Sequence, residues 1–325
     1  IIDNLKNVNQ NTIKFEFDEY IQLNKWEEYF YISPYIKKTP QKEIRGKNLF
    51  ILIEDTLNYN TNYYMALNSC IKDNNEGNVL DTLGYIFSTN YSCDTLSFIG
   101  SLKDAYTLIP LENTWVMLFN KSVNDSLIFK DSPHYIAKTN KNGIFHFPNL
   151  RDSLYKIAAI TGIDFCYNEE EKIAFSDNII NIRKDSFISL FAFDPIIKID
   201  STISDSLFLA PLEPDDSSLA KSIVIEENAL GNLEIITNKK EACIFQLLQN
   251  DRVIGNFFFP APPYLIKGIT AGKYQLKYIV DNNQDSIWNT GNWSERVQPE
   301  KVLNYISEIS IRSNWDLELE WIISK

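Results

Sequence analysis

The sequence predicts an all-β protein built from three consecutive β-sandwich domains. Apolar and polar residues alternate along short segments such as 12–17, 48–53 and 144–147, and a period of two is typical of strands that bury one face. Clusters of turn-forming residues, for example 73–78 and 140–143, interrupt these segments at short intervals. Many short strands with frequent turns favour packed antiparallel sheets, which is the β-sandwich arrangement.

Strand patterns continue through the rest of the chain. Further segments of this type cover 84–89, 114–119, 154–160, 232–237, 273–280 and 306–312. The best helical window is short and lies at 22–30. No strand is followed by a glycine-rich loop and a helix, so the sequence lacks the usual phosphate-binding motifs.

Two interruptions of the strand pattern divide the chain. The first lies at 90–96, and the second, at 195–221, contains the polar and proline-containing run 211–218. The predicted parts are residues 1–93, residues 94–195, a linker at 196–221, and residues 222–325.

A weak internal repeat relates the second and third predicted domains. In both 147–157 and 266–276, an apolar residue precedes a tight turn, and a strand that begins with Tyr155 or Tyr274 follows. The shared layout predicts that these two domains are related sandwiches.

The charge of the chain argues against nucleic acid as a partner. Its 325 residues include 31 Lys and Arg against 43 Asp and Glu, a formal net charge of −12. An acidic surface without a basic cluster repels phosphate backbones and anionic lipid headgroups.

The residue inventory also argues against an enzyme. The chain has two histidines, His134 and His146, which sharply limits zinc sites and histidine-based triads. The serines have no nucleophile-elbow context, and runs of adjacent acids such as 169–171 are typical of a solvated surface. We therefore predict no catalytic residue and no bound organic cofactor.

The four cysteines, at positions 70, 93, 166 and 243, are far apart and show no CxxC spacing. This pattern fits neither a metal cluster nor a dense disulfide framework. Buried free thiols are the ordinary interpretation, and a disulfide between Cys70 and Cys93 is the alternative if their strands meet.

Several segments resemble known bacterial domains. The chain resembles a bacterial Ig-like domain of the SbsA type in segments 15–21, 71–78 and 85–89. It is similar to the carboxypeptidase-regulatory, transthyretin-like sandwich in segments 100–105, 115–118 and 139–145. The combination, together with the tail segments 288–292, 298–302 and 312–316, resembles the Ig-like-domain lipoproteins of the Bacteroidota outer membrane.

This resemblance implies an outer-membrane protein that is lipid-anchored and faces either the cell surface or the periplasm, of which the cell surface is the favoured side. The chain itself holds neither a lipoprotein signal nor the acylated cysteine, so we expect membrane attachment only through an anchor ahead of residue 1. The resemblance further implies that the protein binds other envelope proteins as an accessory or scaffold subunit of a larger complex. Machinery for outer-membrane protein assembly or export is one such complex.

A three-residue pattern recurs along the chain. Its first residue is Asp, its second is Ser or Thr, and its third is an apolar residue or Thr. The triplets begin at Asp55, Asp81, Asp94, Asp125, Asp152, Asp200, Asp205 and Asp285. They look like the O-glycosylation signal of exported proteins in the same phylum, which predicts glycosylation. The alternative is that Asp-Ser and Asp-Thr pairs simply form turns between strands.

One loop resembles the start of a calcium-binding loop. Asp281, Asn283 and Asp285 occupy alternate positions, so three oxygen ligands could converge on one Ca²⁺ ion. Ser286 stands where a sharp turn requires glycine, and Asn292 stands where a bidentate glutamate is expected. The alternative is therefore a plain turn whose side chains bond to local backbone amides.

Tryptophans concentrate near the C-terminal end. Trp288 and Trp293 lie in a predicted loop and are candidates for an interaction surface. Trp315 and Trp321 share the parity of Leu317 along a predicted strand, so we expect them to point inward. The cluster supports a second hypothesis, a carbohydrate-binding or glycan-uptake accessory lipoprotein.

Overall fold

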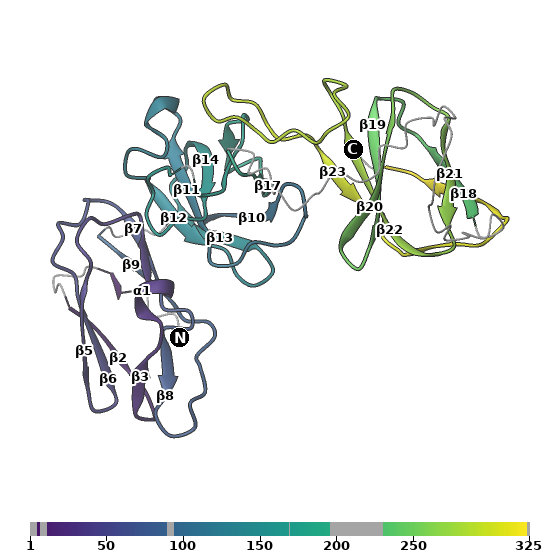
Figure 1. Ribbon diagram of the computed structural model, residues 1–325. Coiled ribbons are helices and arrows are strands. Elements are labelled where there is room, and N and C mark those ends of the chain that lie inside the picture. Colours follow the sequence, from purple (N-terminus) through teal and green to yellow (C-terminus); the bar gives the residue numbers. More distant parts are fainter. Residues whose placement is uncertain (1–4, 7–11, 90–93, 169, 196–229, 324–325) are drawn as a thin grey trace. The chain divides into compact units, whose positions relative to one another are not determined.

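The computed structural model describes residues 5–6, 12–89, 94–168, 170–195 and 230–323, and the chain forms two compact units, Ile1–Pro195 and Ile196–Lys325. Strands dominate both units (Figure 1), so the predicted all-β fold is confirmed. The described helical segments are the short helix α1 (Trp26–Tyr29), inside the predicted helical window, and a 3₁₀ turn at Asp125–Leu127.

The first sandwich combines three small sheets. Its strands are β1 (Leu5–Lys6), β2 (Thr12–Glu16), β3 (Ile21–Leu23), β4 (Tyr31–Ser33), β5 (Gln41–Arg45), β6 (Asn48–Leu52), β7 (Asn62–Ala66), β8 (Ile71–Asp73) and β9 (Gly84–Ser88). The sheet orders are β1-β9-β7-β4, β2-β6-β5 and β3-β8. Alternate residues of β2, β6, β7 and β9, among them Ile13, Leu49 and Phe87, form one buried core.

The second sandwich consists of two sheets that enclose their own core. Its strands are β10 (Leu96–Asp104), β11 (Trp115–Asn120), β12 (Tyr135–Lys138), β13 (Ile144–Leu150), β14 (Leu154–Ile160), β15 (Ile173–Phe175), β16 (Ile180–Asn181) and β17 (Phe187–Ala192). One sheet has the order β13-β10-β17, and the other has the order β12-β11-β14-β15, with β16 also paired to β14. Phe98, Phe147 and Ile157 are among the fully buried residues between them.

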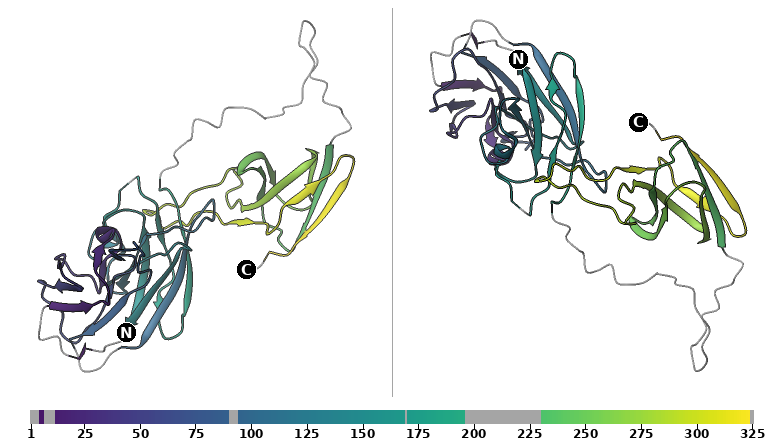
Figure 2. Two further views of the ribbon diagram at one scale, coloured as in Figure 1. Left: turned by 90° about the horizontal axis from the view of Figure 1, so that it is seen from below. Right: turned by 90° about the horizontal axis from the view of Figure 1, so that it is seen from above.

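The third sandwich repeats this arrangement in the second unit. Its strands are β18 (Leu230–Thr237), β19 (Cys243–Gln249), β20 (Arg252–Phe259), β21 (Tyr264–Thr270), β22 (Gly272–Val280), β23 (Val302–Asn304), β24 (Ile309–Ile311) and β25 (Asp316–Trp321). The sheet orders are β21-β18-β25 and β20-β19-β22-β23, with β24 also paired to β22. Figure 2 shows its strands, coloured green to yellow, as two layers.

The correspondence between the two sandwiches extends to register and side chains. In each, the first strand pairs in parallel with the last, β10 with β17 and β18 with β25. The Tyr155 hydroxyl donates to the Arg151 carbonyl at 2.9 Å, and the Tyr274 hydroxyl donates to the Thr270 carbonyl at 2.9 Å. Both bonds reach back four residues across the turn that the sequence repeat aligns, so the two sandwiches share this bond as well as their topology.

The first two sandwiches touch each other within the 1–195 unit. Strand β4 lies along β12, and the Ser33 hydroxyl oxygen accepts a hydrogen bond from the Ile136 amide at 3.0 Å. The rings of Tyr31 and Trp115 meet edge to face at 5.7 Å between centroids. These contacts join two separate cores into one unit.

Lys138 brings a positive charge to this junction. Its ammonium donates to the Glu28 carbonyl and lies 4.2 Å from the ring centroid of Trp115. Burial lowers the pKa of Lys138 to about 8, because desolvation disfavours the charged amine.

Parts of the predicted boundaries lie outside the described residues, since 90–93 and 196–229 fall there. The exact domain limits and the linker at 196–221 therefore stay predictions. Cys93 lies in the same gap, so its pairing is not described; Cys70 and Cys243 are buried free thiols. Cys166 is a free thiol too, but it is exposed, contrary to the expectation of burial.

Candidate functional site

The outer face of the β13-β10-β17 sheet carries an exposed apolar strip at its edge. Ile99 of β10 and Phe187 of β17 are register partners, 41% and 55% exposed. Phe191, four residues further along the same face of β17, is 38% exposed. We call Ile99, Phe187 and Phe191 the β17 face. Strand β17 ends this sheet among the described strands.

Local sequence explains why these side chains point outward. Along β17, Ile188, Leu190 and Ala192 turn toward the core, and the residues between them face solvent, as the alternation of a strand requires. Two phenylalanines on the solvent side of an edge strand are unusual, because natural edges are commonly protected by charge. The strip therefore marks a candidate docking surface.

The equivalent edge of the third sandwich is charged. Strand β25 exposes Asp316, Glu318 and Glu320, and turns Leu317 and Leu319 toward the core. Its register with β18 places Glu318 beside Glu234. Strand β25 therefore carries charge protection of its own, whereas β17 has no charged residue and only Lys103 of β10 lies beside Phe191.

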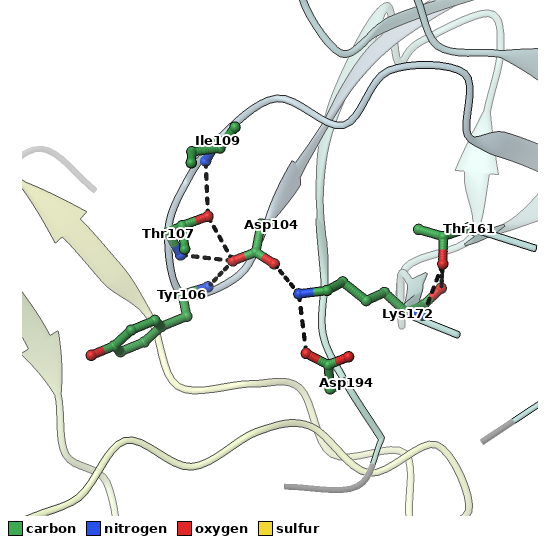
Figure 3. Close-up of polar contacts among 7 residues, drawn as sticks. All are labelled: Asp104, Tyr106, Thr107, Ile109, Thr161, Lys172 and Asp194. Carbon is green, nitrogen blue, oxygen red and sulfur yellow. Dashed lines mark hydrogen bonds and ion pairs between the residues drawn. The ribbon is translucent and has the colours of Figure 1, made fainter. Parts of the chain in front are cut away.

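An ionic cluster around the buried Asp104 closes one end of the second sandwich (Figure 3). Lys172, just before β15, places its Nζ 2.5 Å from Asp104 Oδ2 at the end of β10 and 3.0 Å from Asp194 Oδ2 after β17. Asp104 Oδ1 accepts hydrogen bonds from the Tyr106 and Thr107 amides and from the Thr107 hydroxyl. The cluster thereby ties both sheets of the sandwich together.

The protonation states of this cluster favour an ion pair over a reactive amine. Burial alone would raise the pKa of Asp104, but the bonds from Lys172 and Thr107 outweigh it, and the pKa is lowered. Burial alone would lower the pKa of Lys172, but Asp104 and Asp194 raise it overall. Lys172 is therefore a charged structural link, since an amine nucleophile requires the neutral form.

The predicted calcium ligands meet in one loop. Asp281 is 2% exposed, and its carboxylate accepts the Ser286 amide at 2.9 Å and the Asp285 amide at 3.3 Å. The Asp285 carboxylate accepts the Ile287 amide at 3.0 Å and the Asn283 side-chain amide at 2.8 Å. These bonds are the ones that a side-chain-stabilised turn makes.

Glu300 is a further organiser of this loop that the sequence analysis missed. Its two carboxylate oxygens accept the Asn282 and Asn289 amides at 2.7 and 3.0 Å, and its own amide donates to the Asn289 carbonyl. Burial raises the pKa of Glu300 despite these bonds. Within the described residues, no group of three or more His, Cys, Asp or Glu side chains is suited to a metal; calcium at this loop stays a prediction.

The predicted interaction tryptophans are both half-buried. The Trp288 indole nitrogen donates to the Glu300 carbonyl at 3.0 Å, and the Arg296 guanidinium lies 4.2 Å from the Trp293 ring centroid. Both rings thus have contacts within their own loop, and neither is fully exposed to solvent. Their role as an interaction surface stays a prediction.

The inward orientation predicted for the C-terminal strand holds for Trp321 and is wrong for Trp315. Trp321 packs against the third core with Leu317 and Leu319, whereas Trp315 is 60% exposed. Trp315 precedes β25 and follows Asn314, whose φ is +54°. The strand alternation therefore begins only after it.

The Asp-Ser and Asp-Thr triplets lie mostly in exposed turns. Thr56, Thr82, Thr95, Ser126 and Ser286 are exposed, and Ser153 is half-buried. The triplets at Asp200 and Asp205 lie outside the described residues. Several carboxylates also serve their own turns, as Asp55 does for the Thr56 amide, so the glycosylation and turn interpretations both stay open.

Among the described residues, no helix has the length and hydrophobicity needed to cross a lipid bilayer.

The N-terminal part of the chain has a recognisable family. Residues 2–89 match the model of the bacterial Ig-like domain, which confirms the predicted Ig-like domain at this end. No curated protein matches the chain.

Several solved structures are similar at low identity. The minor pilin GBS52 of Streptococcus agalactiae is 14% identical, with a TM-score of 0.23, and the match covers 70% of this chain and 95% of that one. The TIE protein of Bacillus anthracis is 10% identical, with a TM-score of 0.20 and coverage of 98% and 58%. The N-terminal part of the bacterial S-layer protein SbsC is 13% identical, with a TM-score of 0.19 and coverage of 54% and 42%. Likeness at this level does not extend to function.

Proposed function

We propose that the chain is a non-catalytic binding subunit of the bacterial cell envelope, and that the β17 face docks a partner protein. The observation that carries the proposal is the contrast between two equivalent edges: β17 exposes Phe187 and Phe191, whereas β25 exposes Asp316, Glu318 and Glu320. An unprotected apolar edge is costly for a protein that stays alone, because it invites pairing with other chains.

The partner that this edge fits is an extended strand of another envelope protein. Strand addition uses the backbone groups of a sheet edge for affinity and alternate side chains for specificity. Phe187 and Phe191 alternate on one face of β17, with Ser189 between them, so an added strand would pack its own apolar residues beside them. Aromatic residues are also the typical anchors of protein interfaces.

The finer assignment is an accessory or scaffold subunit of a larger outer-membrane complex, anchored by lipid and facing the cell surface. Its support is the bacterial Ig-like domain at 2–89 and the resemblance of the whole sequence to Bacteroidota outer-membrane lipoproteins. Assembly or export machinery for outer-membrane proteins remains the host complex that we propose. A carbohydrate-binding role for Trp288 and Trp293 has less support, because the two side chains are half-buried.

The test is purification of the native protein from its own membranes with its associated chains. The double variant Phe187→Ser and Phe191→Ser should lose a specific partner that the wild type retains. The matched control, Glu318→Ser and Glu320→Ser on the equivalent edge, should retain it. If both variants kept the same partners, or if the native chain purified alone, the proposed docking role would be wrong.

The anchoring assignment has a separate test. Cells that produce the natural protein are fed an alkyne fatty acid, and the protein should become labelled and remain with the outer-membrane fraction. A protein that stays unlabelled and is released by salt would contradict the lipid anchor without affecting the docking surface.

A further inference from the structure

A polar cleft lies beside the junction of the first two sandwiches, on a different part of the unit from the β17 face. It has a volume of about 710 Å³, within the range of small-ligand sites. The first sandwich contributes Tyr35 after β4 and the loop 58–62 between β6 and β7. The second contributes the segment 132–135 before β12 and the β13–β14 turn at 151–153.

The two walls of the cleft are held together by direct contacts. The Asn62 side chain of the first sandwich donates to Asp94 Oδ2 of the second at 2.9 Å, and within the second sandwich the Asn149 side chain holds Asp94 by donating to its carbonyl at 2.7 Å. The Tyr35 amide donates to the His134 carbonyl at 3.2 Å. The cleft is therefore built by the packing of both sandwiches.

The lining has the chemistry of a site for hydroxyl groups. Its side chains are mostly amides, hydroxyls and phenols, which both donate and accept hydrogen bonds; they include Asn58, Asn60, Asn120, Ser132, Ser153 and Tyr135. Tyr59, 91% exposed, supplies a flat ring that is free of packing. Asn62 is only 5% exposed, and its Oδ1 has no hydrogen-bond partner within the described structure.

The charges in the cleft largely cancel. Asp152 is paired with Arg183 at 2.6 Å, and Asp94 brings one negative charge. Arg151 brings one positive charge, so the lining offers neither a cationic nest for a phosphate nor an acidic cage for a metal. A ligand that matches it carries many hydroxyls and little charge.

We propose that this cleft binds a neutral oligosaccharide, with Tyr59 stacking on a sugar ring and the amides of Asn58 and Asn60 bonding to its hydroxyls. An extended peptide fits less well, because its apolar side chains would meet only Pro34, Pro133 and tyrosine rings. The site is independent of the docking role of β17.

The test uses the full chain and a printed array of neutral tetrasaccharides built from glucose, mannose, galactose, xylose or N-acetylglucosamine. At least one should bind, and titration calorimetry with that tetrasaccharide should show an affinity loss of about tenfold for Tyr59→Ala. Tyr59→Phe keeps the ring and should stay within about twofold of the wild type. Tyr20→Ala, at another exposed tyrosine outside the cleft, is the matched control and should bind normally.

Three outcomes would overturn the proposal: no tetrasaccharide binds, Tyr59→Ala binds as well as Tyr20→Ala, or a peptide array binds in the cleft where the saccharides do not. Tyr59 is solvent-exposed, and an unchanged melting temperature verifies that its variants are folded. The Phe187→Ser and Phe191→Ser variant should bind the tetrasaccharide normally, so a failure of the docking proposal is distinguishable from a failure of this one.

Discussion

The second and third sandwiches share strand order, parallel closure and a tyrosine that bonds back across its turn, yet they differ at two places. The last strand of the second exposes phenylalanines, and the last strand of the third exposes carboxylates. The end of the second is tied by the ionic cluster around Lys172. The matching end of the third is tied by a neutral pair, in which the Asn238 side chain donates to the Ile323 carbonyl and accepts from its amide.

This comparison distinguishes the residues that the shared topology requires from the residues that are particular to each sandwich. Core residues and the corner tyrosine recur because they hold the two sheets together. The outward residues of an edge strand contribute little to that core, so they are free to specify whether the edge repels or accepts another chain. The shared scaffold therefore carries different surfaces.

The largest expected effect concerns the two cores, which we expect to respond separately. Phe147→Ala in β13 should destabilise the second sandwich by about 4 kcal/mol, and Ile266→Ala at the equivalent position in β21 should destabilise the third by about 3 kcal/mol, because each leaves a cavity in a fully buried core. Hydrogen exchange, resolved by peptide, measures each loss. Accelerated exchange in both sandwiches from one substitution would show that their cores are coupled.

The ionic cluster around Lys172 and the neutral pair of Asn238 and Ile323 should differ in how much stability is lost when each is broken, and in how that loss depends on pH. Lys172→Met leaves the Asp104 carboxylate buried with three remaining donors, so we expect a loss of about 2 kcal/mol, below the roughly 3–5 kcal/mol typical of a broken buried pair. Asn238→Ala should cost about 1 kcal/mol. Chemical denaturation, monitored by hydrogen exchange of peptides from each sandwich, measures both losses.

The pH dependence follows from the directions of the two pKa shifts. The pKa of Asp104 is lowered in the folded state, so its contribution is complete above about pH 4 and is lost as the pH falls further. The pKa of Lys172 is raised, so its contribution is complete below about pH 10 and is lost as the pH rises through the folded value. The loss from Lys172→Met should thus shrink at both extremes, while the loss from Asn238→Ala stays constant; equal profiles would contradict the ionic assignment.

Removing the hydroxyl of the corner tyrosine should cause a smaller loss of stability, equal in the two sandwiches. Tyr155→Phe and Tyr274→Phe each remove one hydroxyl that bonds to a carbonyl four residues earlier, and we expect about 1 kcal/mol for each. The melting temperature and local exchange of the full chain are the measurements. A loss in only one sandwich would mean that the corner bond is not a shared requirement of the fold.

Sequence reasoning succeeded where structure is local. Alternation predicted the strands, and the aligned turns at 147–157 and 266–276 predicted the repeat and its tyrosines. It failed at Trp315, because a strand's parity begins only where the strand begins. Local patterns also carry no information on the parallel pairing of β17 with β10, so the exposed strip was missed, although Phe187 and Phe191, four residues apart, share one face of the strand.

The ionic cluster was missed for a similar reason. Asp104 and Lys172 are 68 residues apart in the chain, and the topology alone brings them together. Nothing in the immediate sequence of either residue distinguishes it from an exposed charge.

The smallest expected effect concerns the loop after the fifth matching strand, β14 or β22, which is short in the second sandwich (161–172) and long in the third (281–301). If the long loop is a turn held by its own side chains, the melting temperature of the full chain should be the same in Ca²⁺ and in EDTA. The reason is that the Asp281 carboxylate already accepts the Ser286 and Asp285 amides, and backbone amides require no metal. We expect this outcome.

Calcium binding makes the opposite prediction. An ion bound only by the folded state would stabilise the third sandwich by about 2.7 kcal/mol at a concentration a hundred times its dissociation constant. Chelation would then lower the melting temperature, and Asp281→Asn, which keeps one oxygen but removes the charge, would abolish the difference between Ca²⁺ and EDTA. Glu300→Gln is the control, because its oxygens bond to the Asn282 and Asn289 amides and its substitution should weaken the turn equally in both conditions.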